Sequence, residues 1–179
     1  MASVATGAWA GKDGKIALYI YDAWYFITPL SGWRAWVADA AHEVTHDGTD
    51  WVAGLMALGT TGARTRHSIS EVVHTVTAGA DNTTALIIPD RASLLCVSGR
   101  VTGAITGALA TFSVGIAGQA TKFSSGLATT LDSNFTGPAG FETFWTDTPV
   151  KIFGEGGDLA GGEITLAAHY THYSAPSGA

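Results

Sequence analysis

Hydrophobic and polar residues alternate over short stretches along this chain, and no window keeps the 3.6-residue period of an amphipathic helix. Residues 68–77 show the alternation most clearly, because Ile69, Val72 or Val73, and Val76 alternate with Ser, Glu, His and Thr. Turn residues recur every 8–12 positions between such stretches. This pattern predicts many short antiparallel strands and argues against a mainly helical fold.

The first third of the chain predicts two β-hairpins rich in tryptophan. Residues 16–22 and 24–28 are apolar and aromatic, with the turn at Asp22 and Ala23. Residues 42–46 and 50–52 flank Asp47-Gly48, a strong tight-turn signal. Another strand is expected over residues 33–37.

The next segment, Leu55–Arg66, contains Gly59-Thr-Thr-Gly62 and predicts a linker that begins with a short helical turn. Beyond it the sequence favours strands throughout. Strands are expected over residues 68–77, 85–88, 92–97, 100–105, 110–116, 142–145, 150–153 and 163–170. The predicted fold is therefore all-β: a small Trp-rich β-hairpin module at residues 1–62, followed by an antiparallel β-sandwich or jelly-roll-like domain at residues 63–179.

Composition adds an expectation about assembly. Charged residues make up only 13% of the 179 residues, about half the usual quarter, and the mean hydropathy is +0.22. Because so few charged residues are present to cover the surface, we expect part of it to be buried against other subunits, in a homo-oligomer. The net charge of −6, with no cluster of Lys or Arg, argues against nucleic-acid binding. Residues 101–121 lack charge but hold too much Gly, Thr and Ser for a membrane span, so no membrane insertion is expected.

Sequence motifs for catalysis or cofactors are not found. The chain has no phosphate-binding loop, no dinucleotide fingerprint after a strand and no nucleophile elbow, so we expect no cofactor and no catalytic residue. His42 and His46 lie four apart and His169 and His172 three apart, and neither spacing alone predicts a metal site. The single cysteine, Cys96, excludes an internal disulfide and is expected to be a small core residue.

Tryptophan supplies the best candidate for a binding site. Exposed aromatic rings flanked by Asp and Arg are typical of surfaces that contact sugars. The candidate residues for glycan contact or docking are Trp24, Trp33, Arg34, Trp36, Asp39, Asp47 and Trp51. The alternative is that the tryptophans form the small core of a module of about 45 residues, which has little other material for one. Trp33 and Trp36 lie three apart and face opposite ways on a strand, so one of them is expected in the core.

Several short motifs together resemble one protein family. In the first third these are Gly7-Ala-Trp-Ala-Gly11, Trp24-Tyr-Phe26, Gly32-Trp-Arg-Ala-Trp-Val37 with Asp39, and Asp47-Gly48 with Trp51-Val52. Further matches are Ile88-Pro-Asp-Arg-Ala92, residues 97–108, Phe112-Ser-Val-Gly115, Asp147-Thr-Pro-Val150, residues 156–162 and His169-Tyr170. As a set they resemble a Trp-rich family, long labelled a domain of unknown function, of tail-fibre and spike proteins from alphaproteobacterial phages and gene transfer agents.

The resemblance implies a non-enzymatic virion protein, assembled in the host cytoplasm, that forms a fibre or spike on the tail, baseplate or head. Such proteins are commonly trimers that contact host-surface polysaccharide. Many relatives are longer and carry Asp-Glu where this chain has Asp39-Ala40. Three hypotheses stay open: a receptor-binding fibre or spike, a purely structural decoration or adaptor subunit bound to other virion proteins, and a capsule-degrading hydrolase.

Overall fold

The computed structural model describes residues 4–176, which form fourteen β-strands and one short 3-10 helix. The first third contains η1 (Gly7–Trp9), β1 (Ile16–Ile20), β2 (Ala23–Ile27), β3 (Arg34–Val37), β4 (His42–His46) and β5 (Trp51–Ala53). The remainder contains β6 (Leu55–Leu58), β7 (Arg64–Thr75), β8 (Asp81–Ile88), β9 (Ala92–Gly107), β10 (Thr111–Ile116), β11 (Gln119–Leu127), β12 (Asn134–Thr143), β13 (Thr148–Glu155) and β14 (Leu159–Ser174). The prediction of an all-β fold, with Trp-rich hairpins followed by a sandwich, is confirmed.

The sandwich consists of two antiparallel sheets. The five-stranded sheet has the order β12-β9-β14-β7-β6, and the four-stranded sheet has the order β11-β10-β13-β8. Alternate residues of each strand point between the sheets, as on β8, where every second residue from Asn82 to Ile88 is buried. Phe112, Leu94, Ile152, Ile164 and Leu166 are among the fully buried side chains of this core.

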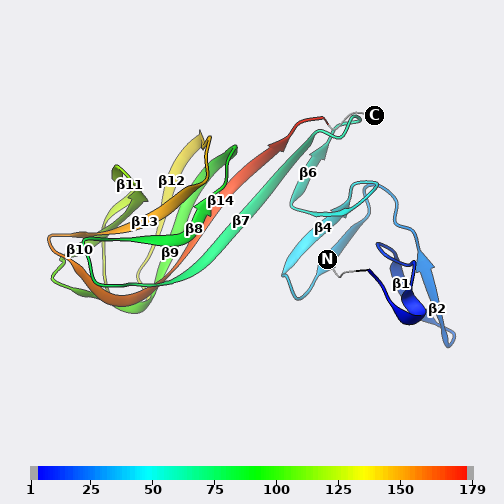
Figure 1. Cartoon of the computed structure of the whole chain (residues 1–179), viewed down its shortest axis with the longest axis horizontal. Helices are drawn as coiled ribbons and strands as arrows, with labels where there is room; N and C mark the ends of the chain where they lie inside the picture. Colours follow the sequence, from blue (N-terminus) through cyan, green and yellow to red (C-terminus); the bar gives the residue numbers. More distant parts are fainter. Residues whose placement is uncertain (1–3, 177–179) are drawn as a thin grey trace.

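The N-terminal strands form two small separate sheets, β1-β2 and β3-β4-β5. In Figure 1 they lie away from the sandwich, beside the far ends of the long strands β7 and β14. Val44 and Val52 are buried within the second sheet. Among the described residues no helix is long and apolar enough to cross a membrane.

The predicted linker at Leu55–Arg66 is wrong in its secondary structure. Leu55–Leu58 is strand β6, which pairs with the start of β7 and belongs to the five-stranded sheet. The Gly59–Gly62 segment makes the turn of this hairpin, where Gly62 has φ +87 and the amide of Gly59 donates to the carbonyl of Ala63. The division into units 1–62 and 63–179 stays a proposal.

Strand β11 and all but the last two residues of β12 were absent from the sequence prediction, and one predicted pair of strands is continuous. Residues 92–97 and 100–105 belong to the single strand β9. Strand β12 contains Gly137 and Pro138, residues that argue against a strand interior. Here they are tolerated because β12 lies at the edge of its sheet, and a side chain on Gly137 would collide with the backbone of Phe123 on β11.

Candidate functional site

The turn between β4 and β5 is organised by the carboxylate of Asp47. Its Oδ1 accepts hydrogen bonds from the amides of Thr49 and Asp50, each at 2.8 Å. The amide of Asp47 in turn donates to the carbonyl of Asp50, and Gly48 supplies a positive φ of 109°. The predicted Asp-Gly turn is therefore present, and Asp47 acts in it as a structural residue.

The same carboxylate joins this hairpin to the base of the long strand β7. Arg64 Nη2 lies 2.8 Å from Asp47 Oδ2, and the Asp47 side chain is only 1% exposed. Nearby, the amide of His67 donates to the carbonyl of Gly54 at 2.9 Å. Gly54 has φ +63, and a side chain there would collide with the carbonyl of His67. These contacts hold the three-stranded sheet against the start of β7.

Burial raises the pKa of Asp47, but the amides of Asp50 and Thr49 and the charges of Arg64 and His46 outweigh it and leave the pKa below its ordinary value of 3.8. A carboxyl whose pKa is lowered by folding stabilises the folded state at pH values above its unfolded pKa. That stabilisation is lost as the pH falls through the folded pKa.

We therefore predict that acid weakens the N-terminal sheets through Asp47. The free energy of unfolding of the wild type should fall below about pH 4, and the Asp47→Asn variant should lose much of this pH dependence. Urea titrations followed by tryptophan fluorescence between pH 2.5 and 7 measure it. Parallel pH profiles for the two proteins would contradict the role of Asp47.

The candidate binding residues fall on two different sheets. Trp24 lies on β2 and is 51% exposed, and its ring centroid is 4.9 Å from that of Trp9 and 5.0 Å from that of Tyr19. The other six belong to the segment of the three-stranded sheet: Trp33, Arg34, Trp36, Asp39, Asp47 and Trp51. Six of the seven thus share one sheet segment without forming a single cluster, and Trp24 lies in a separate aromatic cluster.

Within the three-stranded sheet the tryptophans differ in environment. Trp51 is half-buried, and its ring packs edge-to-face on buried His46 with centroids 5.2 Å apart. Trp36 is 66% exposed and Trp33 38% exposed, so the expectation that one of these two is in the core is wrong. The buried positions of this small sheet are taken by Val44, His46 and Val52 instead. Arg34 pairs with Glu43 at 3.5 Å, and Asp39 is exposed in the β3–β4 turn.

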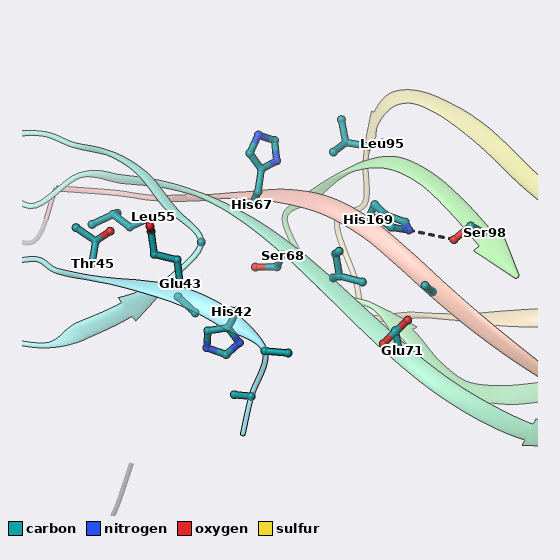
Figure 2. A pocket seen from close by; sticks show the side chains of 16 residues that line it. His42, Glu43, Thr45, Leu55, His67, Ser68, Glu71, Leu95, Ser98 and His169 are labelled. Atoms are coloured by element: carbon teal, nitrogen blue, oxygen red, sulfur yellow. Dashed lines mark hydrogen bonds between the residues drawn. The ribbon is translucent and has the colours of Figure 1, made fainter. Parts of the chain in front are cut away.

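A groove of about 830 Å³ lies between β4 and the outer face of the five-stranded sheet. Figure 2 shows His42, Glu43 and Thr45 on one side and residues of β7, β9 and β14 on the other. His169 Nε2 and Ser98 Oγ are 3.0 Å apart there, and His67 Nδ1 lies 3.1 Å from Thr171 Oγ1. The groove is lined by other residues of the described range 4–176, and none of the seven predicted binding residues is among them.

Among the described residues, the groove lacks several of the groups that catalysis by a serine–histidine pair requires. Nucleophilic catalysis by a serine–histidine pair needs a third group to orient the histidine and donors for the oxyanion. Within residues 4–176, the hydrogen bonds of the His169 ring reach Ser98 and no acid. No cluster of three or more His, Cys, Asp or Glu side chains in the same residues is arranged to hold a metal.

The sequence did not predict that His67, Glu71, Ser98 and His169 line one groove. The alternation along β7 does indicate that His67 and Glu71 share a face, because positions four apart on a strand do so. Ser98 and His169 meet only through the register of β9 against β14, which pairs residues about 70 positions apart. Cys96 is half-buried on the same strand rather than a full core residue, and burial raises the pKa of its thiol.

Comparisons with known proteins match parts of the chain. Residues 1–52 match the model of a family described as "Protein of unknown function (DUF2793)", which covers less than a third of the sequence. No curated protein matches the chain. A chain of the solved structure "Cyanophage Pam1 capsid asymmetric unit" is similar over 65% of this chain and 90% of its own length, with 24% sequence identity and a TM-score of 0.42. A TM-score below 0.5 does not establish a common fold.

Proposed function

We propose that this chain is a non-enzymatic structural protein of a phage-type virion or gene transfer particle, acting as a decoration or adaptor subunit. One observation carries the proposal: the β1–β2 hairpin of the family-matched segment exposes large apolar side chains on both of its faces. Leu18, Tyr19, Trp24 and Tyr25 are each 43–54% exposed. A two-stranded hairpin is at best marginally stable alone in water, so such a surface is suited to burial against another protein.

The size of the accessible surface supports an assembled state. The chain exposes 10268 Å², whereas a compact monomer of this mass exposes about 8,200 Å². The excess of about 2,000 Å² exceeds what each partner buries in a standard interface, about 800 Å². Together with the low fraction of charged residues, this excess favours a homo-oligomer, for which the family resemblance suggests a trimer, bound to other virion proteins.

A second candidate function is host attachment by a fibre or spike subunit. The exposed Trp36, with Arg34 and Asp39 nearby in sequence, is the observation that favours it, because exposed aromatic rings with polar neighbours suit sugar recognition. An oligomer that presents several such sites would bind polysaccharide multivalently and gain avidity over a single site.

Two binding experiments distinguish these two candidate functions. Labelled protein is added to gradient-purified particles from a strain deleted for the gene, and separately to host cells and their extracted polysaccharide. The structural role predicts saturable capture by the particles, with cell binding no higher than that of an unrelated protein. Capture by cells that is lost in folded Trp33→Ala or Trp36→Ala protein would instead favour host attachment. Capture by neither target would contradict both candidates.

A further inference from the structure

The register of β1 with β2 gives the hairpin two distinct faces. Directly opposed residues of an antiparallel pair share a face. Ile16 opposes Ile27, Leu18 opposes Tyr25 and Ile20 opposes Ala23, and we call the surface that these six residues form the aliphatic face. The opposite surface, formed by Ala17, Tyr19, Trp24 and Phe26, is called the aromatic face.

Other residues of the chain pack on one face of the hairpin, although both faces keep exposed side chains, since Tyr19 is 54% and Trp24 51% exposed on the aromatic face. On the aromatic face the ring of Trp9 packs against Trp24 and Phe26, with centroid distances of 4.9 and 5.3 Å, and Lys12 Nζ lies 5.3 Å from the centre of the Phe26 ring. On the aliphatic face the larger side chains remain accessible. Their exposed fractions are 43% for Leu18, 40% for Ile20, 49% for Tyr25 and 40% for Ile27. The aliphatic face is therefore the face on which no aromatic ring or cation from elsewhere in residues 4–176 packs.

The hairpin tip has a conformation that is unusual for its residues. Tyr21 and Asp22 form the two-residue turn between β1 and β2, one residue earlier than the predicted turn, with φ values of 50° and 59°. Two-residue hairpin turns with positive φ are favoured by Asn and Gly, and an aromatic residue there is rare. Tyr21 is also 93% exposed. Figure 1 shows this hairpin on the side of the three-stranded sheet away from the sandwich, where a partner can approach it.

We infer that the aliphatic face of β1–β2 packs against the same face of another copy of this chain. The face carries no charged side chain, so two identical copies can meet there without placing like charges opposite each other. Flat strand faces stack at about 10 Å with their apolar side chains interdigitated. The whole chain exposes about 2,000 Å² more than a compact monomer, and this face supplies part of that excess. This inference rests on the proposed role as an assembling subunit and assigns its self-contact.

The test is the mass of the full-length protein by light scattering between 1 and 100 μM. Wild type should form a defined oligomer, and Leu18→Asp and Tyr25→Asp should each weaken association at least 100-fold by placing carboxylates in the symmetric contact. Leu18→Thr, which keeps a β-forming residue, should weaken association by about tenfold. Ile69→Asp is the matched control, because Ile69 is 62% exposed on β7 outside the hairpin, and this variant should keep the wild-type mass.

The folding of each variant is checked separately by circular dichroism, through the exciton signal of the closely packed Trp9 and Trp24 rings. Three results would overturn the inference: a monomeric wild type at 100 μM, an unchanged mass in both aspartate variants, or equal dissociation by Ile69→Asp. A monomeric protein that is still found in purified particles would refute this self-contact but not the structural role. Absence from particles would refute the structural role regardless of the mass in solution.

Discussion

Replacing Asp47 by alanine is expected to lower the free energy of unfolding of the N-terminal sheets by about 2–4 kcal/mol. The change leaves the amides of Thr49 and Asp50 without their acceptor and removes the ion-pair partner of Arg64. Because the Arg64 side chain is 33% exposed, water can solvate part of its charge, which places the loss toward the lower end of the range. Urea unfolding followed by tryptophan fluorescence measures it.

The matched control for this variant is Asp39→Ala, since Asp39 is an exposed aspartate in the neighbouring β3–β4 turn. Its effect should stay within about 0.5 kcal/mol. If residues 1–62 and 63–179 are separate units, Asp47→Ala should shift an early unfolding transition and leave the later transition of the sandwich in place. Equal stability of the two aspartate variants would contradict the role assigned to Asp47.

Leu166→Ala is expected to destabilise the sandwich by about 2–5 kcal/mol. Leu166 is fully buried on β14, the central strand of the five-stranded sheet, and its truncation leaves a cavity between the two sheets. Leu131→Ala removes the same atoms from a side chain that is 56% exposed, so it should cost less than about 1 kcal/mol. Thermal unfolding followed by circular dichroism compares the two. A Leu166→Ala loss no larger than that of Leu131→Ala would mean that this side chain is not part of a packed core.

Local chemistry explains which elements could be predicted. The β1–β2 and β4–β5 hairpins follow from apolar stretches flanking short turns, and the alternation on β7 is visible in the sequence itself. Strand β12 could not be predicted because its glycines and proline are read locally as turns. Strand β6 contains neither residue, and it was missed because the Gly59–Gly62 segment that follows it resembles a linker. Whether such residues end a strand depends on position within the sheet and on close neighbours such as Phe123 beside Gly137.

The contacts of the candidate site likewise could be predicted only in part from local sequence patterns. Asp47 was identified from the Asp-Gly pair, but its partner Arg64 lies in the segment predicted to be a linker. The pairing of Ser98 with His169 depends on long-range register, which no local pattern contains. Composition did indicate an uncovered surface, and the hairpin register shows which of its exposed residues share a face.

The proposal of a structural virion subunit is tested most directly by quantitative mass spectrometry of gradient-purified particles released by a strain that encodes this chain. The account predicts that the protein co-purifies with the major capsid protein in a fixed ratio of several copies per particle. It should stay bound through a salt wash, because the proposed contacts are apolar rather than charged. Absence of the protein from purified particles, or a variable trace amount that the wash removes, would contradict the proposed function.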